Sequence, residues 1–258
     1  MRAISKPALL LVCLAIALSL HASSSFEAPA TEHFAQGRLL VLPGIRNTKF
    51  HLSGFMNSAQ RQLPNFDISV ETWGLPLMGM LNLRAEQRNL ESAQRIAAEI
   101  TVWRRSHPEQ LFYLMGYSGG GGIAALTLQF LPDDIAIDRL ILIAPAISPE
   151  FPLARHAADH VNEFVANYAS QRDIQVGWGT RTFGTIDRRY GISAGYSGFS
   201  QRFDQLAQWN WSTEDRSIGH RGNHVAYLSR RWQRVDLLPA LDPGRSHAEL
   251  VSYWALRR

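Results

Sequence analysis

Two patterns of apolar and polar positions alternate along this chain of 258 residues. Short runs of consecutive apolar residues are typical of strands buried on both faces, and the segments between them place apolar residues at helical spacing. Strands are expected at residues 38–44, 66–74, 110–116, 137–146, 163–170 and 205–211. Helices are expected at residues 50–63, 89–106, 121–131 and 224–241. Asn89 is the expected N-cap of the second helix.

The alternation of strands and helices predicts the fold class. Strands that follow one another with a helix between them form parallel sheets covered by helices on both faces. We therefore expect an α/β three-layer sandwich with a mostly parallel sheet. No internal repeat or low-complexity linker interrupts the pattern, and a content of 46% hydrophobic and 19% charged residues suits one globular core. One domain over residues 30–258 is the prediction.

The N-terminus has the pattern of a targeting segment. Arg2 and Lys6 precede an apolar run at residues 8–20, which is short for a membrane-spanning helix. Residues 1–25 are therefore expected to be a secretory signal, and the protein to be secreted or periplasmic. Since no A-x-A triplet marks a cleavage site, an uncleaved membrane anchor is the alternative, and it would be the protein's only membrane contact. Cys13 is the only cysteine, so the mature fold is not expected to contain a disulfide.

The charge of the chain argues against one class of partner. The formal net charge is +4, and removal of Arg2 and Lys6 with the signal leaves about +2. Nucleic-acid-binding domains usually carry a larger net positive charge, with Lys and Arg residues clustered on one face. We therefore expect no nucleic-acid partner.

The pattern G-x-S-x-G occurs twice, around Ser118 and around Ser193. A nucleophile elbow needs a strand that ends at the serine, a helix that begins directly after it, and flanking glycines that let the two pack closely. Ser118 has this context, with Gly116 and Gly120 as the flanking glycines. Ser193 lies between polar segments and is interpreted as part of a glycine-rich loop.

A nucleophilic serine requires a base and a carboxylate, which in this kind of sheet follow it in the order acid, then histidine. Asp173 comes just after the fifth expected strand, whereas no apolar strand leads into the alternative acid, Asp187. His224 is the favoured base because an apolar segment follows it, and His220 in the same glycine-containing loop is the alternative.

A developing oxyanion needs two fixed N–H donors. Gly119 begins the helix after the serine, where the helix dipole also favours negative charge. The second donor is expected from Ile45, because Gly44 permits a tight turn after the first strand.

The segments "LVLPGI", "GYSGGGG", "SQRDIQV" and "GNHVAYLS", in that order, resemble the α/β-hydrolase superfamily. The resemblance implies a Ser118–Asp173–His224 triad, an oxyanion hole from Ile45 and Gly119, and acyl transfer without a cofactor. Two departures stand out: there is no room for the antiparallel strands that usually open this fold, and only 16 residues separate the fourth and fifth strands. We therefore expect a reduced sheet, no large cap domain, and a shallow, open site.

The function expected is that of a secreted serine hydrolase acting on a small-molecule acyl ester, like an esterase or lipase. Aromatic residues near the motifs suggest an apolar acyl group: Trp178, Phe183, Tyr190, Trp209 and Trp211. A thioesterase, peptidase or acyltransferase would use the same groups, and a non-catalytic binding protein is the alternative from another class.

A metal site is the remaining possibility raised by the sequence. His156 and His160, and likewise His220 and His224, are four residues apart, but no carboxylate motif accompanies either pair. No metal is expected.

Overall fold

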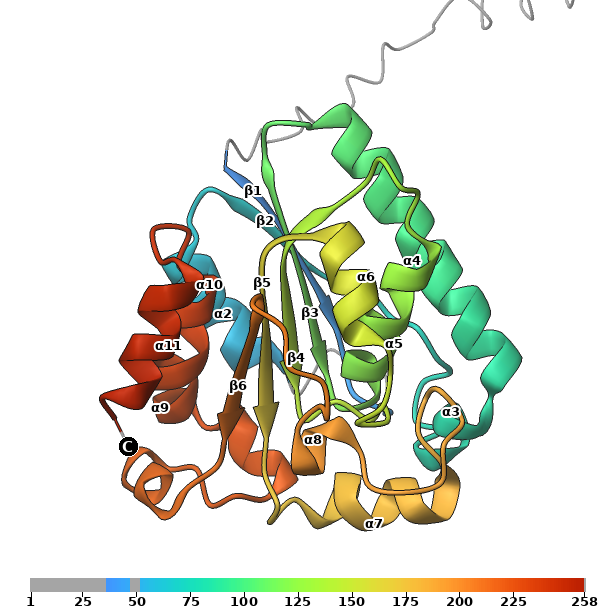
Figure 1. The fold of residues 1–258 in the computed structure, drawn as a ribbon, viewed down its shortest axis with the longest axis vertical. Coiled ribbons are helices and arrows are strands. Elements are labelled where there is room, and N and C mark those ends of the chain that lie inside the picture. Colours follow the sequence, from blue (N-terminus) through green and yellow to red (C-terminus); the bar gives the residue numbers. More distant parts are fainter. Residues whose placement is uncertain (1–35, 47–51, 258) are drawn as a thin grey trace, which may run out of the picture. The chain divides into compact units, whose positions relative to one another are not determined.

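Six parallel strands form one sheet in the order β2-β1-β3-β4-β5-β6 (Figure 1). The structure is a computed structural model that describes residues 36–46 and 52–257. The strands are β1 (Gly37–Leu42), β2 (Phe66–Val70), β3 (Leu111–Tyr117), β4 (Ile137–Ile143), β5 (Val161–Ala169) and β6 (Leu206–Asn210). This arrangement confirms the predicted fold class, a three-layer α/β sandwich, and all strand pairings among the described residues are parallel.

The sheet is buried on both faces because alternate side chains of each strand enter different cores. In β1, Leu40 and Leu42 belong to one core, and Leu39 and Val41 belong to the other. The first core lies under α4 (Glu86–Ser106), α5 (Gly119–Thr127) and α6 (Leu153–His160). The second lies under α2 (Ser53–Gln62), α9 (Arg230–Trp232), α10 (Leu238–Leu241) and α11 (His247–Ala255). Figure 1 shows the two groups of helices on opposite sides of the sheet.

Parallel strands bring their carboxyl ends to one edge of the sheet, where sites in open α/β folds are built. At this edge, at the lower end of Figure 1, lie α3 (Met80–Arg84), α7 (Ile174–Phe183) and α8 (Ala194–Ser197). Three 3-10 helical segments also lie between these elements: η2 (Leu128–Phe130), η3 (Thr213–Ile218) and η4 (His224–Leu228). The loops after β1, β3, β5 and β6 therefore meet at one place.

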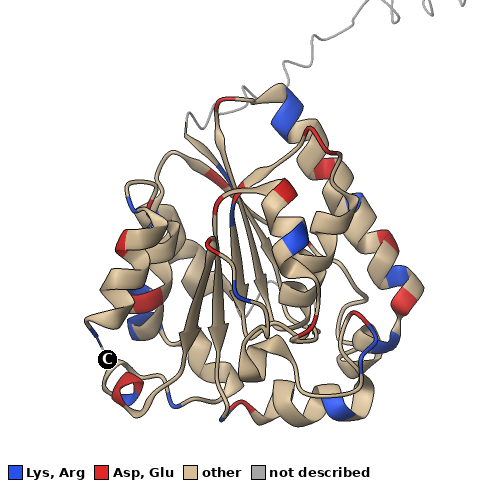
Figure 2. Ribbon diagram, in the orientation of Figure 1, with Lys and Arg blue, Asp and Glu red and all other residues tan. Residues whose placement is uncertain are grey.

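Charged side chains lie mainly on the outer helices and loops (Figure 2). Arg139 on β4 is an exception, since it is almost fully buried. It pairs with Glu163 and donates hydrogen bonds to the carbonyl oxygens of Ala240, Asp242 and Arg245. The C-terminal helices are thus tied to the centre of the sheet.

The expected strands are all present, with shifted ends. The fourth, for example, ends at Ile143 and not at residue 146, because Ala144 turns into the left-handed region with φ of 46°. Asn89 is not a cap: α4 begins at Glu86, and the buried Asn89 side chain donates to the carbonyl oxygens of Asn82 and Leu83 in the segment before the helix.

The helix expected over residues 224–241 is broken into four pieces. After η4, Ser229 leaves helical geometry and caps α9, and a π-helical turn, η5 (Gln233–Leu237), leads into α10. Pro239 sits in the first turn of α10, where its missing N–H is tolerated. Sequence patterns did not predict α3, α7, α8 or α11.

The described residues form one compact unit by their internal contacts. The expected signal, residues 1–25, and its alternative as an anchor lie outside the described residues. Within the described part of the chain, no helix is long and apolar enough to cross a membrane.

Candidate active site

Ser118 stands at the junction of β3 and α5 in a backbone conformation that side chains rarely adopt. Its φ is 58° and its ψ is −121°. The surrounding backbone enforces this geometry, since the Ser118 N–H donates to Ile143 O at 2.8 Å and its carbonyl accepts from Ala146 N at 2.9 Å. A strained residue held this firmly between a strand and a helix is the geometry of a nucleophile elbow.

The glycines on either side of Ser118 provide clearance for the turn. A Cβ added to Gly116 would lie 2.4 Å from the carbonyl oxygen of Gly120, and one added to Gly120 would lie 2.3 Å from that of Pro43. Both clashes are with backbone, which cannot swing aside. Any larger residue at either position would therefore push β3, α5 or the loop after β1 out of place.

Asp173 reaches the same edge from the loop after β5. It is the N-cap of α7: one carboxylate oxygen, Oδ1, accepts hydrogen bonds from the N–H groups of Gln175 and Val176. The other, Oδ2, lies 2.6 Å from Nδ1 of His224. Asp173 is fully buried, so the helix start fixes its carboxylate and leaves one oxygen for the histidine.

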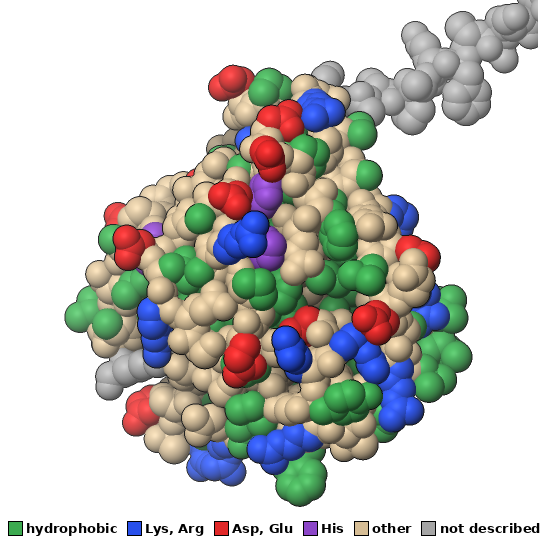
Figure 3. Space-filling view, turned by 45° about the vertical axis from the view of Figure 1, so that its right-hand side comes forward, with side chains coloured by type: hydrophobic (Ala, Val, Ile, Leu, Met, Phe, Trp, Pro, Cys, Tyr) green, Lys and Arg blue, Asp and Glu red, His purple; other side chains and the backbone are tan. Residues whose placement is uncertain are grey.

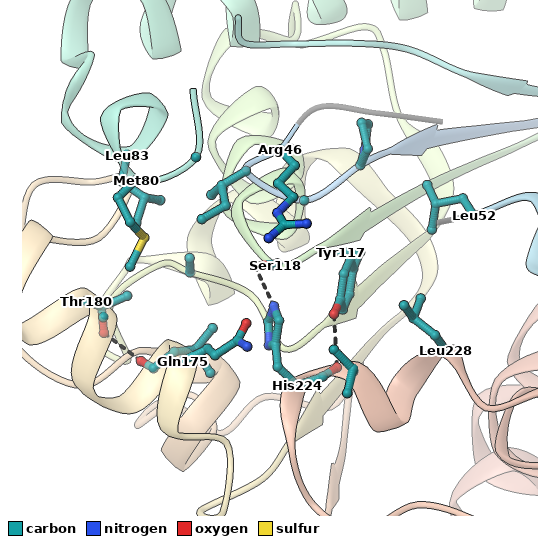
Figure 4. A pocket seen from close by; sticks show the side chains of 18 residues that line it. Arg46, Leu52, Met80, Leu83, Tyr117, Ser118, Gln175, Thr180, His224 and Leu228 are labelled. Carbon is teal, nitrogen blue, oxygen red and sulfur yellow. Dashed lines mark hydrogen bonds between the residues drawn. The ribbon is translucent and has the colours of Figure 1, made fainter. Parts of the chain in front are cut away.

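His224 lies between Asp173 and Ser118. Its Nε2 is 2.9 Å from Ser118 Oγ (Figure 4), and its other ring nitrogen, Nδ1, contacts Asp173. With Nδ1 protonated, the imidazole donates to the carboxylate and accepts the serine hydroxyl proton. The structure therefore brings together the three residues favoured from the sequence, in hydrogen-bonding order.

Two residues that the sequence analysis missed hold His224 in place. The Tyr117 hydroxyl donates to the backbone carbonyl of His224 at 2.9 Å, and the two rings stack at 4.9 Å between centroids. Burial raises the pKa of Tyr117, which keeps the phenol protonated as a donor. Ser170, directly after β5, donates to Gly222 O. Gly222 belongs to the loop between η3 and η4, residues 219–223, which we call the histidine loop. Both contacts join residues far apart in sequence, so no local pattern signals them.

The alternative acid and base lie elsewhere. The Asp187 carboxylate accepts from the N–H and hydroxyl of Ser148 and from the hydroxyl of Thr185, so it fixes the loop after β4. His220 is fully buried, and its Nδ1 accepts from Gly222 N. Burial lowers its pKa to about 3, so this ring is a neutral packing element. The second serine, Ser193, is buried at the start of α8 and donates to Val176 O.

The loop after β1 lies directly beside the serine. A Cβ on Gly44 would be 3.4 Å from Ser118 Cβ, and one on Gly119 would be 2.6 Å from Ile45 Cγ2. Gly119 is the first residue of α5, so its N–H has no acceptor within the helix. Ile45 and Gly119, the two expected oxyanion donors, are therefore neighbours next to Ser118.

Three hydrogen bonds strap this loop to residues 73–82. Trp73 Nε1 donates to Pro43 O at 2.7 Å, Asn82 Nδ2 donates to Ile45 O at 2.7 Å, and Leu77 N donates to Arg46 O at 2.9 Å. Asn82 is completely buried. We refer to these three contacts as the loop strap; they fix the backbone that carries Ile45.

Ser118 and His224 open into a pocket of about 580 Å³, within the usual range for small-molecule sites. The walls come from the loop after β1, α3, α7 and η4, and they are largely apolar. Ile45, Leu52, Met80, Leu83, Val176 and Leu228 contribute to them. The site is a walled pocket, so the expectation of a shallow surface was wrong. The walls come from α3 and α7, outside the interval between the fourth and fifth strands where a cap was sought.

None of the five aromatic residues expected near the site lines this pocket. Trp209 is buried in the second core, and Trp178 and Tyr190 are largely exposed. Apolar side chains are also exposed on the loops and helices of this edge: Leu77, Leu81, Ile174, Trp178 and Val225. Figure 3 shows apolar and basic side chains alternating at the lower end of the molecule, where α7 lies in Figure 1.

The histidine pairs singled out in the sequence do not form a metal-binding cluster. Among residues 36–46 and 52–257, no group of three or more His, Cys, Asp or Glu side chains is placed to hold a metal ion. His160 instead contacts Ile135 O through Nδ1 at 2.9 Å.

No protein-family model matches this sequence, and no curated protein matches it. Solved structures match with low identity. A predicted CIB-like hydrolase from Thermoplasma acidophilum is 15% identical over 82% of this chain and 88% of its own, with a TM-score of 0.46. Lipase B from Aspergillus fumigatus is 13% identical over 89% of this chain and 64% of its own, with a TM-score of 0.49.

Phospholipase PlaB from Legionella pneumophila, solved in complex with thio-NAD, is similar in fold with a TM-score of 0.50. It is 10% identical over 86% of this chain and 62% of its own, so this chain spans less than two thirds of that protein. At this identity the likeness concerns the fold alone. It agrees with the parallel sheet described above.

Proposed function

We propose that this chain, which has the α/β-hydrolase fold, is a secreted serine hydrolase that cleaves carboxylic esters with an apolar acyl group. The observation that carries the proposal is the continuous hydrogen-bond path from Ser118 Oγ through His224 to Asp173 at the floor of an apolar pocket. A serine hydroxyl is a weak nucleophile alone, and this path supplies the base it needs.

In the proposed reaction, Ser118 Oγ attacks the ester carbonyl carbon while His224 Nε2 takes the hydroxyl proton. The imidazolium that forms is stabilised by the carboxylate of Asp173, which remains ionised. The carbonyl oxygen becomes negative and accepts hydrogen bonds from the N–H groups of Ile45 and Gly119, each worth about 3 kcal/mol in such sites. His224 then gives the proton to the alcohol as the ester bond breaks, and the acyl group stays bound to Ser118.

Water completes the cycle. His224 takes a proton from a water molecule that attacks the acyl carbonyl, and the carboxylic acid leaves as Ser118 regains its proton. The apolar walls, including Met80 and Leu83, suit an aliphatic acyl chain. Export through the N-terminal segment is part of the proposal and rests on the sequence pattern of residues 1–25.

The test is a series of 4-nitrophenyl esters of increasing acyl length, assayed with the wild-type protein and with Ser118→Ala. Labelling by a fluorophosphonate probe provides a second readout. We expect hydrolysis and labelling by the wild type, and neither by Ser118→Ala, whose circular dichroism should match the wild type. A folded wild type that neither hydrolyses esters nor reacts with the probe would favour a binding protein. Labelling together with faster turnover of thioesters or amides would move the substrate class to thioesterase or peptidase.

A further inference from the structure

One formal charge lies in the lining of the pocket, and it belongs to Arg46. The other described lining residues are neutral side chains or glycines, apart from His224. In Figure 4 the Arg46 side chain extends over the pocket toward the pair formed by Ser118 and His224. A guanidinium is therefore presented to whatever group occupies the space above the serine.

Arg46 has no carboxylate partner among the described residues, unlike Arg38, Arg95 or Arg139, each of which forms an ion pair. Its backbone is nevertheless fixed, because its carbonyl accepts the Leu77 N–H of the loop strap and the preceding carbonyl accepts from Asn82. The backbone of Arg46 is therefore held in place, while its guanidinium forms no ion pair with any of the described residues.

The position of this cation matters for the proposed reaction. His224 must become an imidazolium as Ser118 attacks, and an unpaired positive charge nearby opposes that step. An anionic group on the substrate would pair with the guanidinium, which removes this penalty and adds charge-assisted hydrogen bonds. Both effects favour a negatively charged substrate over a neutral one of the same shape.

We propose that Arg46 is a specificity-determining residue that binds a carboxylate or a similar oxyanion of the substrate, so that the preferred substrates are esters with an anionic group a few bonds from the scissile carbonyl. This inference rests on the proposed ester hydrolysis. The anionic group can belong either to the acyl chain or to the alcohol, and matched substrates distinguish the two sources.

The test compares charged and neutral esters that differ by one group. For the acyl side, the mono-4-nitrophenyl ester of glutaric acid is compared with 4-nitrophenyl pentanoate, in which a methyl group replaces the carboxylate. For the alcohol side, 3-carboxyphenyl butyrate is compared with phenyl butyrate. Assays at about pH 7.5 keep the carboxylates ionised, with spontaneous hydrolysis subtracted.

We expect Arg46→Gln to lower the ratio of kcat/KM for the charged over the neutral ester about tenfold or more on one of the two sides. The matched control is Arg221→Gln, which removes an exposed arginine from the histidine loop, outside the pocket lining. It should leave the ratio within about twofold, since its charge lies outside the pocket lining and solvent screens it from the substrate. Equal loss on charged and neutral esters would overturn the proposal and indicate that Arg46 acts on the reacting oxygen instead.

A binding measurement separates this inference from the proposed function. Glutarate is titrated calorimetrically into Ser118→Ala and into Ser118→Ala with Arg46→Gln. Binding about tenfold weaker in the double variant supports the anion site even if the wild type hydrolyses no ester. Equal affinity, or no binding by either variant, overturns the anion site without touching the role of Ser118.

Discussion

The hydroxyl of Tyr117 donates to the backbone carbonyl of His224 at 2.9 Å, and the Tyr117 ring stacks on the imidazole. The residue directly before Ser118 therefore positions the side chain that contacts Ser118. Because Tyr117 is also the last residue of β3, this hydrogen bond fixes the backbone of His224 to the sheet.

Tyr117→Phe tests this relationship. It keeps the stacked ring but leaves a buried carbonyl without its donor, which costs about 1–3 kcal/mol of folding free energy. We expect kcat to fall several-fold with little change in KM, measured by ester hydrolysis and urea denaturation. Tyr113→Phe is the control on the same strand, because the buried Tyr113 hydroxyl has no hydrogen-bond partner among the described residues. That variant should match the wild type in activity; a similar kcat loss in both would assign the effect to β3 packing.

Asp173→Asn separates the two candidate acids. If the asparagine keeps its oxygen on the N–H groups of Gln175 and Val176, its NH2 group faces Nδ1 of His224. This favours the tautomer protonated on Nε2 and does not stabilise an imidazolium, so kcat should fall by about 10³- to 10⁴-fold. Asp187→Asn weakens the contacts to Ser148 and Thr185, so it should lower the unfolding free energy while kcat of the folded protein falls less than about tenfold. The reverse ranking of the two kcat values would reassign the acid.

The elbow glycines should be intolerant of even one methyl group. Gly116→Ala and Gly120→Ala place a Cβ within 2.4 Å of backbone oxygens, so we expect loss of soluble folded protein or of all activity. Gly191→Ala is the matched control, since a Cβ there meets nothing within 4 Å. Its melting temperature and kcat should stay close to those of the wild type. Wild-type activity in Gly120→Ala would contradict the described approach of the loop after β1.

Stability should depend on pH through His220. Burial lowers its pKa to about 3, compared with about 6.5 in the unfolded chain. Between these values the unfolded state binds the extra proton, so this contribution to stability is present above about pH 6.5 and is lost as the pH falls toward 3. Urea denaturation from about pH 7.5 to 4.5 should show a decline that is smaller in His220→Asn by roughly 2–3 kcal/mol. Equal losses of stability in the wild type and in His220→Asn would show that the pKa of His220 is not lowered in the folded protein.

The sequence was sufficient for the elbow because its signals are local. The apolar run before Ser118, the glycines around it and the helix after it are all within twenty residues. The position of Asp173 could also be predicted, since a carboxylate just after a strand lies at the carboxyl edge of the sheet. His224 was favoured on other local grounds, since it lies in a glycine-containing loop and an apolar segment follows it.

Other parts depended on contacts that no local pattern encodes. The helix α7 was missed because Gly177, Gly179 and three threonine or tryptophan positions give "IQVGWGTRTF" a weak helical signal. Asp173 starts this helix by capping it, and a Cβ at Gly177 would lie 2.6 Å from the Tyr196 ring, so the close packing there favours glycine. The pocket wall that α7 forms could therefore not be predicted from the sequence.

The loop strap was missed for a similar reason. Asn82 contacts Ile45 across 37 residues, and a single asparagine within the apolar segment 75–83 carries no sign of such a partner. Its meaning depends on the fold that brings α3 over the loop after β1.

The segment of residues 73–82 uses different residues to fix the loop that carries Ile45 and to line the pocket. Trp73, Leu77 and Asn82 hold the backbone around Ile45, whereas Met80, on the same segment, lines the pocket and packs against Gly179. Exchanging Met80 for smaller or larger aliphatic residues would resize the chamber for a shorter or longer chain while the anchoring amides stay where they are. The preferred length of the acyl chain can thus be changed at Met80 alone, without moving Ser118, His224 or the backbone of Ile45.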